Sequence, residues 1–557
     1  MELTQGQARP EKKHAVFFLF IFFTCLYLLT AGGHFYNQDG YLKYLTLDQI
    51  VKGEGPFHPR FFTPGLDGRS TTSFPPGTSF WMLPLYAGGK ACTVLVLHWK
   101  PAAAINPDLF FAPLFVTFLN VFFSAGLCAL FFSMLCRMGL AFRAALGAAV
   151  CLGLGTFLWP YSKFCYSEPQ AAFFLWAAFM ALYALKQRGG HPGMAILWLG
   201  CAFLTKYETI FLWPAFGGYG FFCLQKCRRA NPKGFIFFTA LPLILTAALF
   251  ITWNYVRTGH AWTFGRYGGY LFSNLWGWGA AGAVVISGVF YLLKRPAAGD
   301  RRREIKFIFM AAAGLAAYLL AVPPARSEVI ALLWAPGKSL FVFSPPLLLA
   351  VAGYRDFLKT FRAEGLLVAA FVVSYLLFLP PTIQSAAWQW GSRFWVSLTP
   401  FLFLPALPAL LENQNRLRKN WLGLLFGVSF CAQVISVSIS YQDTFNYTAQ
   451  KISADFRQPV EDFEIERKIV FPRMIYDWRY APLWMQSKIL QSVLGWKELP
   501  TLPEPLAFKS RVKSPQEWKL DFWWIYLWNW PGGAWAVRLS FLLIVSGAAA
   551  SLARLLR

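Results

Sequence analysis

Long apolar runs alternate with short polar segments along almost the whole of this 557-residue chain. Many of these runs are long enough for a helix to cross the roughly 30 Å hydrocarbon core of a bilayer. They lack the residue-by-residue alternation that is typical of outer-membrane β-strands. The pattern therefore predicts an all-α polytopic membrane protein with about 11 to 14 transmembrane helices. We expect these helices near residues 15–32, 110–135, 141–160, 170–186, 193–205, 209–225, 233–253, 274–293, 307–323, 339–353, 364–380, 394–411, 420–440 and 537–556.

Composition supports the same class of protein. Hydrophobic residues make up 57% of the chain and charged residues only 14%. Soluble globular proteins carry about 25% charged residues. A soluble core could not bury this much apolar surface, so the composition excludes an ordinary soluble enzyme.

The net charge of +25 is explained by membrane topology rather than by nucleic acid. Lys and Arg cluster in every second loop, as the positive-inside rule requires. This arrangement predicts that both termini lie inside and that residues 33–109 and 441–536 lie outside. The basic clusters are Arg9, Lys12 and Lys13; Arg137 and Arg143; Lys186 and Arg188; Lys226, Arg228 and Arg229; Arg301 to Arg303; Lys359 and Arg362; and Arg416 to Lys419.

This topology divides the chain into three parts. Residues 1–440 form a transmembrane module with a first outer loop at 33–109, of which 33–77 are expected to fold as short surface helices. Residues 441–536 form an outer segment without cysteine, so its folding does not depend on disulfides. Residues 537–557 form the last transmembrane helix.

Two apolar runs have an alternative interpretation. The stretch 79–97 could cross the membrane, but this would invert the sidedness of every later loop, so we expect it to be interfacial or re-entrant. The first run could be a cleaved signal peptide ending near Ala31. Its length favours an uncleaved anchor.

Ionisable residues collect at the outer ends of the predicted helices. Transporters tend to place charges or broken helices near the middle of the membrane. The distribution here instead favours chemistry at the outer interface. The residues concerned are Asp39, Asp48, Asp67, Lys163, Glu168, Lys206, Glu208, Arg257, Arg266, Arg326, Glu328, Lys338 and Arg393.

Two acidic residues in this set each have two interpretations. Asp39 opens a helix-like stretch, Gly40 to Lys52, and is either an N-cap or a general base. Asp48 is too far along that helix to form a carboxylate pair with Asp39. Glu168 precedes Pro169 at a helix start, and is either part of that start signal or a second active-site carboxylate and possible metal ligand.

Three basic residues are candidates for binding phosphate. Arg393 follows Gly391 and Ser392 at the start of a predicted helix, where the helix dipole also favours an anion. Snorkelling to the lipid headgroups is the alternative. Lys338 repeats the arrangement in Pro336-Gly337-Lys338-Ser339. Lys206 could contact a ligand or pair internally with Glu208.

Four tryptophans, Trp523, Trp524, Trp528 and Trp530, precede the last apolar run. Tryptophan is enriched at membrane interfaces, so we interpret them as an aromatic belt. Stacking against carbohydrate is the alternative.

Taken together, these segments resemble the GT-C superfamily of integral-membrane glycosyltransferases, near its bacterial protein mannosyltransferase and aminoarabinose transferase branches. The resemblance covers most of residues 15–411. Two departures from these relatives are visible. The acidic dipeptide of the mannosyltransferases is Gln38-Asp39 here, and the Trp-Trp-Asp-Tyr-Gly signature of oligosaccharyltransferases is absent, which disfavours an asparagine acceptor. The motifs that carry the resemblance are Asn37-Gln38-Asp39-Gly40-Tyr41, Phe74-Pro75-Pro76-Gly77, Ser167-Glu168-Pro169, Gly337-Lys338-Ser339-Leu340-Phe341 with Ser344-Pro345, and Trp390-Gly391-Ser392-Arg393-Phe394.

The resemblance implies a glycosyltransferase of the bacterial inner membrane with its active site on the periplasmic side. A sugar would pass with inversion from a polyprenyl-phosphate donor to a hydroxyl of a lipid, glycan or protein acceptor. Asp39 would be the base and Glu168 a second catalytic carboxylate. Arg393, Lys338, Lys206 and Arg266 would hold the donor phosphate, and any divalent metal would bind Asp39 and Glu168.

Two other functions remain open from the sequence. A lipid-linked sugar flippase or a polysaccharide polymerase would also need an outer cationic pocket, and a flippase would need a polar track through the bundle. A non-catalytic assembly subunit would have no enclosed cavity near Asp39.

Overall fold

The computed structural model describes residues 10–99, 110–225, 232–263, 323–378, 389–408, 416–456, 466–500, 502, 517–528 and 533–556. These residues are overwhelmingly helical. The strands within them are β1 (Thr63–Pro64) and β2 (Ser70–Thr71), which pair antiparallel in the first loop. The predicted helices 274–293 and 307–323 lie outside the described residues, apart from Pro323.

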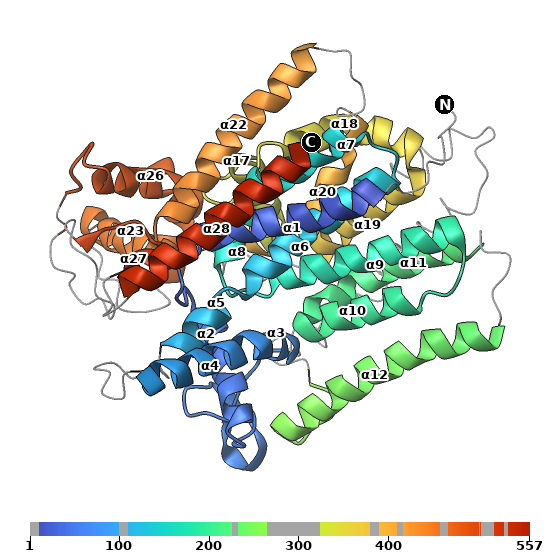
Figure 1. The fold of residues 1–557 in the computed structure, drawn as a ribbon, viewed down its shortest axis with the longest axis horizontal. Helices are drawn as coiled ribbons and strands as arrows, with labels where there is room; N and C mark the ends of the chain where they lie inside the picture. The colour runs from blue at the N-terminus through green and yellow to red at the C-terminus, as the bar shows by residue number, and fades with distance from the viewer. Residues whose placement is uncertain are drawn as a thin grey trace.

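The first and last helices of the chain pack against each other, and the last one lies on the surface of the bundle. Helix α1 (Pro10–Thr30) packs between α28 (Gly533–Leu556) and α6 (Leu119–Arg137), and α6 packs on α9 (Glu168–Arg188). Helices α1 and α28 run in opposite directions, so both ends of the chain lie at one end of the bundle, which we call the terminal end (Figure 1). This agrees with the prediction that the termini share a side.

Five helical segments of the described chain are long and apolar enough to cross a membrane: Phe111–Arg137, Glu168–Arg188, Ile236–Thr258, Asn420–Ser438 and Gly533–Leu556. Most other predicted runs are also helical, but in shorter pieces. These are α7 (Phe142–Leu154), α8 (Leu158–Lys163), α10 (Gly193–Thr205), η3 (Tyr207–Leu212), α11 (Trp213–Gln225), α16 (Pro323–Trp334), α17 (Leu340–Phe343), α18 (Leu347–Thr360), α19 (Arg362–Phe378), η6 (Arg393–Leu398), α20 (Thr399–Phe403) and η7 (Leu404–Ala406). Two of the five long segments belong to α12 (Pro232–Thr258) and α22 (Arg416–Ser438).

Several predicted spans of the described chain are broken rather than continuous. The run 339–353 is divided between α17 and α18 at Pro345 and Pro346, and the run 394–411 begins as η6, α20 and η7 around Pro400 and Pro405. Proline removes a helical hydrogen bond and clashes with the preceding turn. The run 141–160 is divided between α7 and α8.

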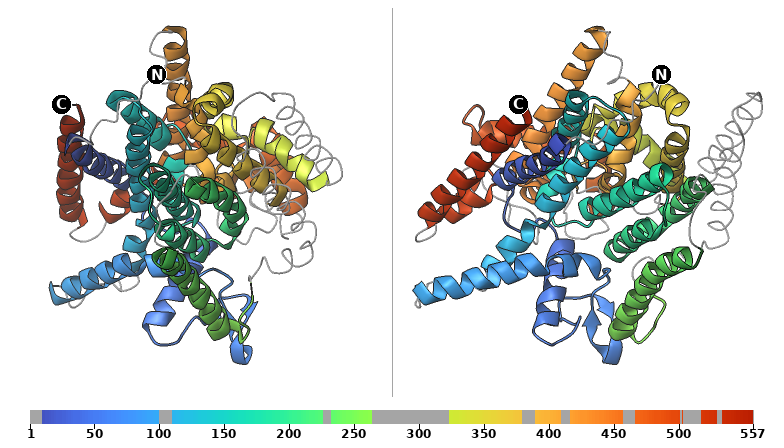
Figure 2. Two further views of the ribbon diagram at one scale, coloured as in Figure 1. Left: turned by 90° about the vertical axis from the view of Figure 1, so that its right-hand side faces the viewer. Right: turned by 45° about the vertical axis from the view of Figure 1, so that its right-hand side comes forward.

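The first loop and the outer tail (residues 441–536) lie at the other end of the bundle, which we call the loop end (Figures 1 and 2). Short helices dominate both, as predicted for 33–77. The stretch 79–97 is helical, as α3 and α4, and its placement at the membrane interface stays a prediction. The elements are α2 (Gln38–Val51), η1 (Leu66–Gly68), α3 (Gly77–Trp81), α4 (Leu83–Trp99), α23 (Tyr441–Phe456), η8 (Glu466–Val470), α25 (Phe471–Tyr476), η9 (Trp478–Tyr480), α26 (Pro482–Val493) and α27 (Trp523–Trp528). Helix α5 (Phe111–Thr117) follows the first loop and begins the long segment Phe111–Arg137.

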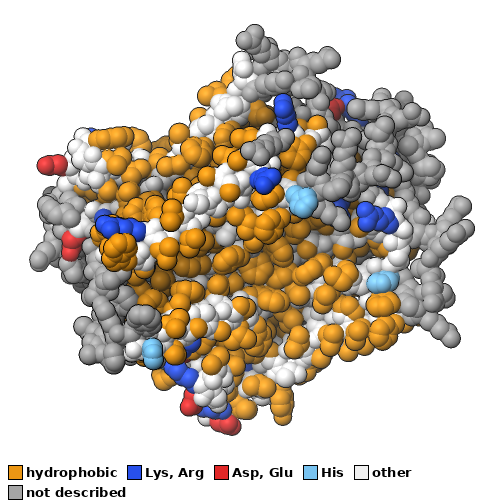
Figure 3. Space-filling view, in the orientation of Figure 1, with side chains coloured by type: hydrophobic (Ala, Val, Ile, Leu, Met, Phe, Trp, Pro, Cys, Tyr) orange, Lys and Arg blue, Asp and Glu red, His pale blue; other side chains and the backbone are white. Residues whose placement is uncertain are grey.

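The surface of the bundle is apolar over a broad face. Figure 3 shows hydrophobic side chains across the middle of this face and charged ones near its margins. Ile244 on α12 is 62% exposed and Leu543 on α28 is 64% exposed. Such a continuous apolar surface is stable only in lipid, so the protein is a membrane protein.

Candidate active site

Asp39 lies in the first turn of α2, at the loop end. The helix is capped by Asn37, whose side chain accepts a hydrogen bond from the Gly40 N–H at 2.7 Å. The interpretation of Asp39 as the N-cap is therefore wrong. Gly40 matters here because an added Cβ would lie 2.7 Å from the Cβ of Cys165. A glycine allows the start of α2 to pack on the segment that leads to Glu168.

Glu168 is the first residue of α9 and is fully buried. Its Oε1 accepts hydrogen bonds from Arg393 Nε at 2.7 Å and from Lys206 Nζ at 2.9 Å. The carboxylate is thus held by two cations from other segments. Glu168 therefore joins α9 to the segments that carry Arg393 and Lys206, which is more than the start of a helix requires.

Arg393 joins the two candidate carboxylates. Its Nη2 lies 3.0 Å from Oδ2 of Asp39, while its Nε bonds Glu168. The guanidinium also stacks on the ring of Tyr166 at 3.7 Å. Arg393 opens the 3-10 helix η6, two residues after Gly391, which adopts a positive φ of 55°. It points inward to the cluster, so the snorkelling alternative is wrong.

Lys206 completes what we call the charge cluster: Asp39, Glu168, Arg393, Lys206 and Glu208. Lys206 ends α10, and its Nζ lies 3.3 Å from Oε1 of Glu208. The predicted internal pair between these two residues is confirmed. Three acids and two bases leave the cluster with a formal charge of −1.

Lys43 is a neighbour of the cluster that the sequence analysis missed. It lies one turn after Asp39 on α2, is buried, donates to Ser167 Oγ at 3.4 Å, and lies 4.9 Å over the Phe74 ring. Burial lowers the pKa of Lys43 from 10.5 to about 8, although Asp39 and Glu168 oppose the shift. The spacing of four residues from Asp39, which puts both on one helix face, is the signal that could have identified it.

Lys338 supports the segment that carries Arg393. Its Nζ donates to the carbonyl oxygens of Gln389 at 3.1 Å and Gly391 at 2.9 Å. Burial, together with the charge of Arg393, lowers the pKa of Lys338 to about 7. The structure thus places Lys338 beside the Arg393 segment, with these bonds directed to backbone. Arg266, the fourth candidate for the phosphate, lies outside the described residues.

Among the described residues, two buried oxygens of the charge cluster accept no hydrogen bond: Glu168 Oε2, and Glu208 Oε1, which is still paired with Lys206. A buried carboxylate oxygen without a donor is costly, so Glu168 Oε2 could accept a hydrogen bond from a ligand or water.

The cluster fits a divalent metal poorly. Asp39 and Glu168 both face Arg393, so a cation bound by both would lie beside a guanidinium charge. Among the described residues, no three His, Cys, Asp or Glu side chains gather as a metal site.

Four other predicted outer-end residues lie outside this cluster. Asp48 accepts from Tyr86 and Lys52. Arg257 donates to the Thr72 carbonyl. Asp67 and Arg326 are exposed. None of these four contributes a charge to the cluster.

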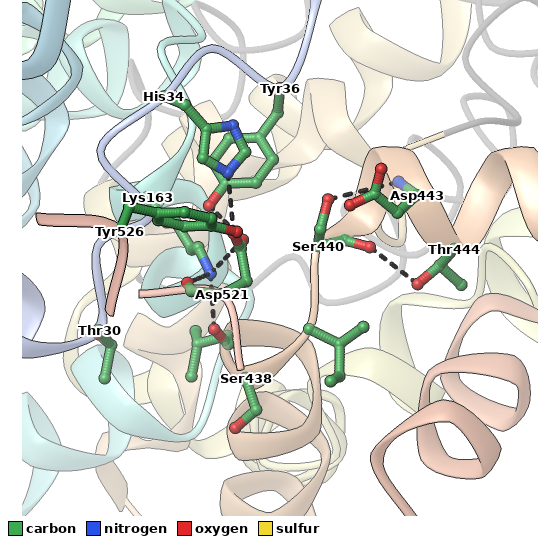
Figure 4. A network of polar contacts seen from close by, with 12 residues as sticks. Thr30, His34, Tyr36, Lys163, Ser438, Ser440, Asp443, Thr444, Asp521 and Tyr526 are labelled. Atoms are coloured by element: carbon green, nitrogen blue, oxygen red, sulfur yellow. Dashed lines mark hydrogen bonds and ion pairs between the residues drawn. The ribbon is translucent and has the colours of Figure 1, made fainter. Parts of the chain in front are cut away.

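Lys163 belongs to a second polar network, centred on the buried Asp521 of the outer tail (Figure 4). The Asp521 carboxylate lies 2.8 Å from Lys163 Nζ and accepts from Tyr36 and Tyr526, and His34 Nε2 lies 2.8 Å away. Burial alone would raise the pKa of Asp521, but Lys163 and His34 hold it well below its usual range. The network fastens the outer tail to the start of the first loop.

Two of the four predicted belt tryptophans fasten the same region. The indoles of Trp523 and Trp524 donate to the carbonyl oxygens of Leu28 and Leu29, at the end of α1. Trp528 is 45% exposed, and Trp530 lies outside the described residues.

Comparisons with known proteins give little beyond this geometry. No family model matches the chain, and no curated protein matches it. Among solved structures, the crystal structure of the Archaeoglobus fulgidus oligosaccharyltransferase in the apo form is similar, with a TM-score of 0.42 and 13% identity over 91% of this chain. The match covers 62% of the length of that protein.

Proposed function

We propose that the protein is a glycosyltransferase that moves a sugar from a polyprenyl-phosphate donor to an acceptor hydroxyl at the outer face of the membrane. The observation that carries the proposal is the contact between Asp39 and Arg393, 354 positions apart in the chain. It sets a carboxylate that can take a proton beside a guanidinium that can hold a phosphate.

The two sides of Arg393 differ in access, and this difference suggests how the donor binds. Asp39 is 24% exposed, whereas Glu168 is fully buried. A donor phosphate approaching from the exposed side would replace Asp39 on Nη2 while Glu168 kept Nε in place. Binding of the donor would thus free the Asp39 carboxylate to contact the acceptor hydroxyl.

The chemistry then needs one displacement. The oxygen of the acceptor hydroxyl attacks the anomeric carbon from the face opposite the phosphate. Asp39 takes the proton of that hydroxyl as the new bond forms. The bond between that carbon and the phosphate oxygen breaks, and its electron pair leaves with the polyprenyl phosphate. Arg393 and Lys43 would stabilise the growing charge on the phosphate. The anomeric centre is inverted, and Asp39 ends protonated.

Replacement of Asp39 by Asn tests this function. The amide cannot take a proton and no longer competes with the phosphate for Arg393. We expect transfer to fall by about 10²- to 10⁴-fold, the usual contribution of a general base, while affinity for the donor stays equal or increases. The assay follows radiolabelled sugar from polyprenyl phosphate into product in nanodiscs.

Asp67→Asn is the matched control, since Asp67 is an exposed first-loop aspartate and should tolerate the change. More than half of the normal transfer rate in Asp39→Asn would refute the role as base. Movement of the intact donor between leaflets, with no glycosidic product, would instead identify a flippase.

A further inference from the structure

A groove of about 570 Å³ extends to the terminal end of the bundle, whereas the charge cluster lies at the loop end. It is formed where α6 ends, α9 ends and α10 begins. Arg137, Arg188 and His191 line its polar end, and Met180 and Trp198 belong to its apolar wall. None of the residues lining this groove is acidic. The two arginines lie near enough to repel each other, so an anion between them would be stabilised.

A second groove of about 490 Å³ continues from the first. Leu130 and Phe173 line both, and the second groove runs on between α1, α6 and α9 past Gly126 and Phe122. Its lining is entirely apolar. Phe122 and Arg137 lie on the same helix, and at about 1.5 Å per residue the composite groove is about 22 Å long.

The composite groove has the polarity of a membrane lipid. Its charged end lies at the terminal end, which the basic loops place on the inside, and its apolar part extends toward the centre of the bilayer. Basic pockets between transmembrane helices on the inner side suit anionic headgroups, because that leaflet carries a negative surface potential. Charge complementarity selects this occupant over the apolar helix of a partner protein, because two arginines and a histidine line the polar end. The acyl chain of a lipid needs no polar group along the second groove.

We propose that the composite groove binds an anionic glycerophospholipid of the inner leaflet. Its phosphate lies between Arg137 and Arg188, and an acyl chain runs along Leu130 and Phe173. This site is separate from the proposed donor site, which is at the opposite end of α9.

Native mass spectrometry of the purified full-length protein tests the site. The probes are phosphatidylglycerol and phosphatidylcholine of identical chain length, added to delipidated protein in detergent. We expect phosphatidylglycerol to bind at least tenfold more tightly. The double variant Arg137→Ala/Arg188→Ala should lose this preference, since it removes both cations from the groove.

The matched control is Arg143→Ala/Arg355→Ala, which removes the same charge from two exposed arginines outside the groove and should keep the preference. Ala181→Trp fills the apolar wall without changing charge, and should weaken both lipids. Equal binding of phosphatidylglycerol by the wild type and the Arg137/Arg188 variant would overturn the proposal. So would full competition by inorganic phosphate, which would show an anion site without a lipid.

Discussion

At the scale of single residues, Arg393 holds the candidate site together because its planar guanidinium presents two donors in different directions. Lysine carries the same charge but cannot bond Asp39 and Glu168 in this geometry. We expect Arg393→Lys to weaken donor binding by about tenfold or more, since a hydrogen bond to a charged group contributes about 1.5–3 kcal/mol. Titration calorimetry with a polyprenyl-phosphate sugar, in the Asp39→Asn background to prevent turnover, measures the change.

The control for Arg393 is Arg326→Lys, a change at an exposed arginine that should leave affinity unchanged. If Arg393→Lys binds the donor as tightly as the background variant, the phosphate is held elsewhere, and Lys43 becomes the next candidate.

Lys43 gives donor binding a pH dependence with a definite sign. Its pKa of about 8, against 10.5 when exposed, means that the folded protein loses this charge as pH rises through about 8. A phosphodiester stays ionised throughout, so donor affinity should fall between pH 7 and pH 9. Lys43→Met should bind more weakly at pH 7 and vary less over this range.

An equally steep loss of affinity in Lys43→Met would assign the titration to another group and contradict this role. Stability should respond in the opposite direction. Between about pH 8 and 10.5 the unfolded chain binds the proton that the folded chain has lost, so Lys43 adds to stability as pH rises.

The sequence identified most of the charge cluster, because charges are rare in an apolar chain and stand out. It did not identify the pairing. Asp39 was interpreted as a base or cap and Arg393 as a phosphate ligand, but their direct contact depends on how α2, α9 and η6 pack. The cap itself could have been predicted from the sequence. Asn is a preferred N-cap residue, and Asn37 is placed so that its side chain accepts from the N–H of Gly40, the third residue of α2.

At the scale of elements, the sequence predicts which segments are helical but not where those helices are interrupted. Periodicity and length located α1, α9, α10 and α28 to within a few residues. The division of 339–353 between α17 and α18 could have been read from Pro345 and Pro346. The break between α7 and α8 has local and tertiary causes. Gly155 is the C-cap of α7 and the Leu158 N–H donates to Thr156 Oγ1, while the Phe157 N–H donates to Ser344 Oγ, 187 positions away.

The Asp521 network is the element-scale feature that invites a test, because it joins the outer tail to Lys163 and the first loop. Asp521→Asn would leave the buried Lys163 without its countercharge. Breaking a buried ion pair by removing one partner costs about 3–5 kcal/mol. We expect a lower Tm and faster hydrogen exchange in residues 31–39 and 517–528, measured by mass spectrometry.

Asp455→Asn serves as the control, since Asp455 pairs with Lys451 on α23 in the same tail but is 38% exposed. Its effect should be within about 1 kcal/mol. Unchanged exchange in residues 31–39 of the Asp521 variant would show that the network does not fasten the tail to the loop.

At the scale of the whole molecule, the charge pattern and the fold describe the same two ends. The basic residues Arg137, Arg188 and Arg355 lie on helices that place them at the terminal end, and the charge cluster lies at the loop end. The positive-inside rule then predicts that the loop end is outside. Neither the fold nor the apolar surface fixes this direction by itself, because a bundle packs equally well in either orientation.

Cysteine labelling in intact cells tests the orientation. In a cysteine-free background, we expect a membrane-impermeant maleimide to label Glu54→Cys in the first loop and Trp484→Cys in the outer tail, both at exposed positions. Arg355→Cys, exposed at the terminal end, should react only after permeabilisation. Labelling of Glu54→Cys and Trp484→Cys from different sides would contradict the fold, whereas full reversal of the pattern would keep the fold and place the charge cluster inside the cell. In that case a donor in the outer leaflet could not reach Arg393, and the proposed function would fail with the orientation.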